Sequence, residues 1–164
     1  MDGVCQAAVD LVKEFEGFRS KAYTCPANVP TIGYGHTGPD VKMADVGRKA
    51  VTMEEAWELL RTDLTKAAAD VDELVKVPLT RNQRGALASF VFNLGSGSFA
   101  RSTLLRVLNQ GDYVAAAEQF RVWDKAKVKG ALVTLGGLSR RRAAECLLFC
   151  TPDTQYPAVS EEGE

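Results

Sequence analysis

Residues 16–36 read E-G-F-R-S-K-A-Y-T-C-P-A-N-V-P-T-I-G-Y-G-H and concentrate the chemistry of the chain in one stretch. Eight residues separate Glu16 from Cys25, and five more separate Cys25 from Thr31. The prolines between Cys25 and Thr31 favour a turn that reverses the chain and places Thr31 opposite Cys25. We therefore expect an acid, a thiol and a hydroxyl to face one small space.

The residues that precede this stretch predict a helix that ends at Glu16. Apolar side chains repeat at helical spacing, at Val4, Ala8, Leu11, Val12 and Phe15. Gly17 follows directly and can take the left-handed C-cap position. The negative end of a helix and partial burial both disfavour the ionised form of Glu16, which suits a proton donor.

The spacing of these residues resembles the catalytic motif of the phage-type lysozymes, the soluble endolysins of glycoside hydrolase family 24. In that pattern Glu is followed after eight residues by Asp or Cys, after five more by Thr, and then by a T-I-G-x-G-H-like run. The resemblance implies that Glu16, Cys25 and Thr31 are catalytic. The alternative interpretation is a glycine-rich hairpin after a helix, with Glu16 merely exposed.

Later segments extend the resemblance over about residues 8 to 150. F-N-L-G at 92–95 and G-L-S-R-R-R-A-A-E at 137–145 are similar to the exit of the family's central helix and to its closing motif. The substrate-binding residues that we predict are Gly35, His36, Phe92, Asn93 and Arg141. From its place in the closing motif, Arg141 is expected to approach Glu16. We also expect His36 to pack the hairpin lobe by pairing with Asp63.

Length and composition limit the architecture. A chain of 164 residues with 46% hydrophobic residues is one domain or two small lobes with a buried core. The net charge of −1 is unevenly distributed, with −4 in residues 1–80, +7 in 81–150 and −4 in 151–164. The basic second half favours an anionic polymer such as a bacterial wall. Solvated helix faces explain most of these charges equally well.

Periodicity and capping signals predict a mostly helical chain. Residues 21–36 are expected to form a β-hairpin, with a third strand near Val41–Met43. Capping boxes at Thr52 and Thr80 open a long helix to Val75, stopped by Pro78, and a second helix that breaks at Gly95–Ser98. Further helices are expected at 102–109, after Asp112, and from Ser139 to Phe149, with a basic glycine-rich loop at 125–137.

These elements and the resemblance together predict an α+β, lysozyme-like fold. A small β-hairpin lobe is joined by a long helix to a larger helical lobe, with the active-site cleft between them. Residues 1–150 are expected to form a single catalytic domain, with a β-rich lobe at about 17–51 and a helical lobe from 1–16 and 76–150. Residues 151–164 are acidic and expected to be disordered.

The four cysteines, Cys5, Cys25, Cys146 and Cys150, have no metal-binding spacing. Buried free thiols are the default expectation, although a disulfide after export stays open. No metal or other cofactor is expected. A thiol hydrolase built on Cys25 and His36 is disfavoured, because no oxyanion signature accompanies the pair.

The resemblance implies hydrolysis of the β-1,4 bond between N-acetylmuramic acid and N-acetylglucosamine in peptidoglycan. Glu16 would protonate the leaving oxygen, and Thr31 would hold a water with Cys25 as second neighbour or, if ionised, as base. We expect that the pKa of Cys25 is not lowered beside an acid. The alternatives are a lytic transglycosylase-like or chitosanase-like enzyme, and a non-catalytic wall-binding module of the same fold.

No stretch is apolar enough to span a membrane, and residues 1–13 do not form a signal peptide. Neither membrane insertion nor a nucleic-acid partner is expected, and a monomer is predicted. The resemblance implies that the protein stays in the host bacterial cytoplasm until a holin gives it access to the periplasm and cell wall.

Overall fold

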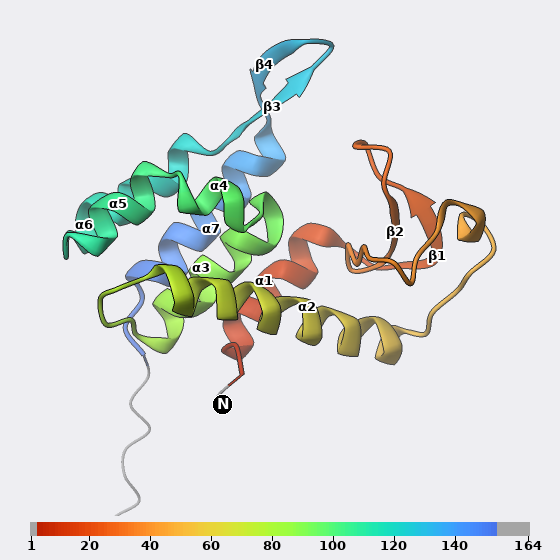
Figure 1. Cartoon of the computed structure of the whole chain (residues 1–164), viewed down its shortest axis with the longest axis horizontal. Helices are drawn as coiled ribbons and strands as arrows, with labels where there is room; N and C mark the ends of the chain where they lie inside the picture. The colour runs from red at the N-terminus through yellow and green to blue at the C-terminus, as the bar shows by residue number, and fades with distance from the viewer. Residues whose placement is uncertain (1–2, 154–164) are drawn as a thin grey trace, which may run out of the picture.

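The computed structural model describes residues 3–153, in which a small β lobe and a larger helical lobe are joined by one long helix (Figure 1). The predicted α+β, lysozyme-like architecture is confirmed. The helical lobe includes α1 (Gln6–Glu16) from one end of the chain and α7 (Gly136–Cys150) from the other. Within the described residues, no helix is both long and apolar enough to cross a membrane.

The β lobe is built on the antiparallel hairpin of β1 (Arg19–Thr24) and β2 (Pro30–Gly33). The predicted third strand near Val41–Met43 is wrong, because the chain enters a 3-10 turn, η1 (Met43–Asp45). The Asp45 carboxylate accepts a hydrogen bond of 2.7 Å from the Lys42 N–H, and such local bonds compete with strand pairing. Instead, the hairpin gains isolated bridges from Lys21 to Ala50 and from Ile32 to His36.

The long helix α2 (Met53–Leu74) links the two lobes. Its predicted capping box is confirmed, since Thr52 Oγ1 accepts from the Glu55 N–H and Glu55 accepts from the Thr52 N–H. The helix ends at Leu74, before Pro78, because the Asn109 side chain takes up the hydrogen bonds of the backbone there. Asn109 accepts from the Lys76 N–H at 2.7 Å and donates to the Leu74 carbonyl at 3.1 Å.

Helix α3 (Arg81–Leu94) lies at the centre of the helical lobe, in contact with α1, α2 and α7. All seven residues from Gly85 to Val91 are buried, as expected for a helix surrounded by others. Gly85 permits the close approach of α1. A Cβ there would lie 2.6 Å from the Cys5 sulfur and 2.9 Å from the Ala8 Cβ.

Shorter helices complete the lobe: α4 (Ser96–Ala100), α5 (Thr103–Asn109), α6 (Tyr113–Gln119) and the 3-10 turn η2 (Phe120–Val122). The helices predicted at 102–109 and after Asp112 are confirmed, and the side chains of Ser102 and Asp112 cap them. Gly95 does end α3, but the chain then forms α4 instead of staying irregular. The Phe90 ring makes edge contacts with Phe99, Phe120 and Trp123, which closes the core.

Residues 125–137 are not the loop that we predicted. They form a second hairpin of β3 (Lys125–Val128) and β4 (Ala131–Thr134), which projects from the helical lobe (Figure 1). Its two-residue turn, Lys129-Gly130, has positive φ at both positions, which matches the twist of a hairpin. Helix α7 accordingly begins at Gly136, so Ser139 lies within its first turn and does not cap it.

The chain after α7 packs against the start of α3. The Asp153 carboxylate accepts hydrogen bonds from the N–H groups of Arg81 and Asn82, at 2.8 and 2.9 Å. An acid at a helix N-terminus satisfies free donors and complements the helix dipole. Residues 151–153 therefore have defined contacts, and the rest of the tail that we predicted to be disordered lies outside the described residues.

The tight contact of α1 with α3 makes Gly85 sensitive to substitution. We expect Gly85→Ala to lower the free energy of unfolding by roughly 1–3 kcal/mol, although alanine favours helix, because the added methyl overlaps Cys5 and Ala8. Urea unfolding followed by circular dichroism measures the change. Gly3→Ala is the control, since a Cβ there meets no atom within 4 Å. Equal stability of the two variants would contradict the argument.

Candidate active site

Glu16 is the last residue of α1 and stands where the chain leaves the helical lobe for the β lobe. Gly17 ends the helix with φ 67° and ψ 157°, and its N–H bonds to the Lys13 carbonyl at 3.0 Å. That backbone conformation is readily adopted only by glycine. The predicted helix end is confirmed, and the Glu16 side chain keeps 21% of its surface exposed.

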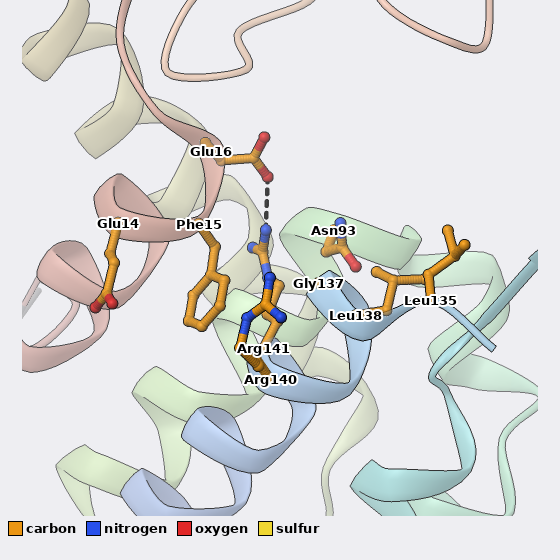
Figure 2. Close-up of a pocket in the computed structure, with 9 residues that line it drawn as sticks. All are labelled: Glu14, Phe15, Glu16, Asn93, Leu135, Gly137, Leu138, Arg140 and Arg141. Atoms are coloured by element: carbon orange, nitrogen blue, oxygen red, sulfur yellow. Dashed lines mark hydrogen bonds and ion pairs between the residues drawn. The ribbon is translucent and has the colours of Figure 1, made fainter.

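Arg141 reaches Glu16 from α7, as the sequence predicted. Arg141 Nη1 donates to Glu16 Oε1 at 2.7 Å, and Figure 2 shows the two side chains meeting between α1 and α7. Only 4% of the Arg141 side chain is exposed. A buried guanidinium at this distance makes a strong, charge-assisted hydrogen bond that fixes one oxygen of the carboxylate.

Gly35 packs its backbone against the other oxygen. A Cβ at Gly35 would lie 2.7 Å from Glu16 Oε2, and the φ of Gly35 is +73°. Both the close approach and the backbone conformation require glycine there. The Glu16 carboxylate is therefore held between an arginine of the helical lobe and a backbone segment of the β lobe.

Cys25 and Thr31 flank the turn between β1 and β2. The Thr31 hydroxyl donates to the Val29 carbonyl at 2.9 Å, and the Val29 carbonyl also accepts from the Cys25 N–H at 3.0 Å. Hydrogen bonds from the backbone N–H of Val29, and then from Ala27 and the Thr31 hydroxyl, lower the pKa of the Cys25 thiol. Our expectation that this pKa is not lowered is therefore wrong.

Thr31 has one hydroxyl proton and two acceptors for it. With Cys25 neutral, the proton lies on the bond to the Val29 carbonyl, and the oxygen lone pairs stay available. With Cys25 ionised, the same proton can turn to the thiolate. In both states the proton is taken within the protein, and the oxygen lone pairs of Thr31 are what a third partner can use.

Tyr23 was missed by the sequence analysis, although it lies directly opposite Thr31 in the hairpin register. Burial, followed by the negative charge of Glu16, raises the pKa of Tyr23. The Arg19 guanidinium stacks over its ring at 4.5 Å. The signal was available in the strand alternation, because Tyr23 and Thr31 on paired strands must share a face.

Glu145 is a second functional residue to which the sequence analysis assigned no role, although it ends the closing motif. It is fully buried, and it accepts from Ser89 Oγ at 2.7 Å, Arg141 Nε at 3.2 Å and Arg142 Nη1 at 2.8 Å. Burial raises the pKa of Glu145, and the adjacent guanidiniums oppose that shift. Arg142 in turn donates to the Asn93 side chain. Glu145 thus fixes the two arginines that contact Glu16 and Asn93.

His36 joins the β lobe to α2. Its Nδ1 lies 2.7 Å from Asp63 Oδ2 and its Nε2 lies 3.1 Å from Asp40 Oδ2, with the ring largely buried. The predicted pairing with Asp63 is confirmed. Because both ring nitrogens have carboxylate partners, the geometry favours a positioning role for His36, and its contact with substrate stays a prediction.

Two cavities lie on either side of the end of α3. The first, of about 560 Å³, is lined in part by Glu16, Asn93, Arg140 and Arg141 (Figure 2). The second, of about 240 Å³, is lined in part by Gly35 and Phe92. Five of the eight predicted site residues thus line one or other of these two cavities, whereas Cys25, Thr31 and His36 line neither. Among residues 3–153, no three His, Cys, Asp or Glu side chains gather closely enough to hold a metal.

A helical lobe and a hairpin lobe that meet at one glutamate define a lysozyme-type glycosidase. The sequence profile of the phage lysozyme family matches residues 13–145, and the chain belongs to that family.

Known relatives agree with this assignment. An endolysin of Acyrthosiphon pisum secondary endosymbiont phage 1 is 44% identical over 146 residues, which cover 89% of this chain and 97% of the relative. The muramidase domain of SpmX from Asticaccaulis excentricus superposes with a TM-score of 0.84 at 41% identity, covering 93% of this chain and 100% of that domain. The endolysin of Escherichia coli O157:H7 phage FAHEc1 has a TM-score of 0.81 at 37% identity and covers 96% and 97%. The protein is a lysozyme that hydrolyses peptidoglycan as an endolysin.

The contact between Arg141 and Glu16 predicts a loss of both activity and stability on substitution. Arg141→Ala removes the donor to one oxygen of the Glu16 carboxylate and one of the two arginines that pair with the buried Glu145, so kcat should fall at least about tenfold and the free energy of unfolding by roughly 3–5 kcal/mol. Arg141→Lys keeps a charged donor and should lose less of both. Initial rates on peptidoglycan and urea unfolding measure the two effects. A wild-type kcat in a folded Arg141→Ala enzyme would show that Arg141 does not position Glu16.

Proposed function

We propose that Glu16 is the proton donor for cleavage of the β-1,4 bond between N-acetylmuramic acid and N-acetylglucosamine. The observation that supports this role is the position of its carboxylate at the edge of the cavity, with one oxygen on Arg141 and the other against Gly35. A bound glycan would exclude water from the partly exposed carboxyl group. The protonated Glu16 would pass its proton to the leaving oxygen.

The attacking water is held by Thr31 in this proposal. Whether the Thr31 proton is directed to the Val29 carbonyl or to a Cys25 thiolate, the lone pairs of the hydroxyl oxygen can accept a hydrogen bond from the water and orient it. Cys25, with its lowered pKa, is the neighbour that can take the water's proton as a thiolate. Most glycosidases use a second carboxylate for this step. Here a Cys25 thiolate, stabilised by the surrounding backbone donors, would supply the negative charge.

Substrate binding is assigned to the two cavities. Asn93 and Arg141 line the first, and Gly35 and Phe92 line the second, so a strand that crosses the end of α3 contacts both groups. His36 does not line either cavity, but it fixes the loop beside Gly35 through its contacts with Asp63 and Asp40. We further propose that the protein acts as a monomer, and that it remains in the host bacterial cytoplasm until a holin gives it access to the periplasm and cell wall.

Glu16→Gln tests the central assignment. The change keeps the shape and removes the transferable proton, so lysis of permeabilised Gram-negative cells should fall at least about a hundredfold. The thermal midpoint verifies that the variant folds. Glu118→Gln makes the same chemical change on the exposed face of α6 and should keep full activity. Mass spectrometry of the wild-type products should find reducing muramic acid ends. Anhydro ends would instead identify a transglycosylase.

A substitution series separates the possible roles of Cys25. If the thiol helps to order the water, Cys25→Asp should keep or raise activity, Cys25→Ser should stay partly active, and Cys25→Ala should lose more. Thr31→Ala should be less active than Cys25→Ser. If Cys25 is an obligate nucleophile, the Asp and Ser variants should both be inactive. A loss in Cys25→Asp as deep as in Glu16→Gln would exclude the water-ordering role.

The lowered pKa of Cys25 gives an independent measurement. A depressed pKa means that the thiolate forms at lower pH in the folded protein than in the unfolded chain. Labelling of Cys25 by iodoacetamide should therefore reach half its maximal rate at lower pH in the native protein than in urea. Peptide mass spectrometry distinguishes Cys25 from the other three thiols, which are also free.

A further inference from the structure

The β3–β4 hairpin continues the wall of the first cavity. Leu135 directly follows β4, and Gly137 and Leu138 begin α7, and all three line the same cavity as Glu16. From this rim the hairpin projects away from the helical lobe (Figure 1). A ligand that fills the cavity and extends past Leu135 therefore meets the hairpin.

The strand register gives the hairpin two different faces. Residues directly opposite one another share a face. One face carries Lys125, Lys127, Leu132 and Thr134, and the other carries Ala126, Val128, Ala131 and Val133. Leu132 lies opposite Lys127, and 68% of its surface is exposed. This leucine therefore does not contribute to the core. The first face thus presents cations beside an exposed aliphatic side chain.

The charge of this region is one-sided. Between Lys125 and Arg142 there are six basic residues and no acidic one. Glu145 engages Arg141 and Arg142, and Asp124 engages Lys125. Across residues 3–153, no carboxylate lies within ion-pair distance of Lys127, Lys129 or Arg140. Exposed cations without internal partners are available to an anionic ligand.

The opposite wall of the cavity is acidic. Glu14 and Glu16 of α1 line this wall, and Glu16 is paired with Arg141 (Figure 2). An anionic branch is therefore repelled by Glu14 on the α1 side and attracted to the cations of the hairpin side. This asymmetry orients the branches of a bound strand toward the lysines.

We propose that the β3–β4 hairpin is a docking surface for the anionic peptide stems of peptidoglycan. Lys127, Lys129 and Arg140 bind the stem carboxylates, and Leu132 packs against the methyl groups of its alanines. The dimensions agree, because a four-residue strand extends about 13 Å and a stem of about four residues spans at most roughly 14 Å. The inference rests on the proposed function, since it places the glycan in the cavity beside Glu16.

The test compares two substrates on one enzyme. Glycan strands that keep their stems and strands freed of stems by an amidase are digested by the wild type and by the double variant Lys127→Glu/Lys129→Glu. The preference of the wild type for stem-bearing strands should fall by about tenfold in the variant, through KM and not through kcat. Added salt should reduce the wild-type preference in the same direction.

The matched control is Arg101→Glu/Arg106→Glu, which changes the charge equally at two exposed arginines around a different cavity. Its preference should equal that of the wild type. Lys127→Gln/Lys129→Gln should give an intermediate value, and thermal midpoints verify that each variant folds. An unchanged KM ratio in the folded charge-reversal variant overturns the proposal.

Two other outcomes are distinguishable. If charge reversal abolishes binding to phosphatidylglycerol vesicles but leaves the KM ratio unchanged, the hairpin is a lipid-binding surface and the proposal is wrong. If the wild type cleaves neither kind of strand, the proposed function itself fails and the stem assignment fails with it. Cleavage of both strands with no preference contradicts the docking surface alone.

Discussion

The buried carboxylate of Glu145 is the interaction on which the active site depends. It lies between two arginines of its own helix, and each of these extends to a residue on the cavity wall, Arg141 to Glu16 and Arg142 to Asn93. Two guanidiniums without Glu145 would be desolvated and mutually repulsive. Removing one partner of such a buried group typically costs about 3–5 kcal/mol. The position of Glu16 is therefore set by a charge that never meets solvent.

The β lobe is attached to the same framework by a separate contact. His36 lies between Asp40 of its own lobe and Asp63 of α2, so the loop that carries Gly35 is held at a fixed distance from the helical lobe. Gly35 in turn closes one side of the Glu16 carboxylate. Glu16 is thus held by Arg141 from the helical lobe and by Gly35 from the β lobe. A change at either contact would move the carboxylate relative to the turn with Cys25 and Thr31.

The sequence predicted those features whose signals are local. Capping boxes at Thr52 and Thr80 and the spacing of Glu16, Cys25 and Thr31 need no tertiary information, and the resemblance supplied the approach of Arg141. The β3–β4 hairpin was missed because its turn is Lys-Gly and not the familiar Asn-Gly, and because its lysines hide the alternation of apolar residues. The lowered pKa of Cys25 was missed for a different reason. It depends on backbone N–H groups, which residue types do not reveal.

The placement of α1 and α7 has a consequence for the order of synthesis. The contact of Glu16 with Arg141 joins residues 125 positions apart, and both helices pack on α3, which lies between them in the sequence. A ribosome releases the N-terminal helix long before the C-terminal one. A nascent chain therefore carries Glu16 without its arginine, and without Glu145, until the last helix has emerged. Catalytic competence is acquired in one late step, when the two ends of the domain close around α3.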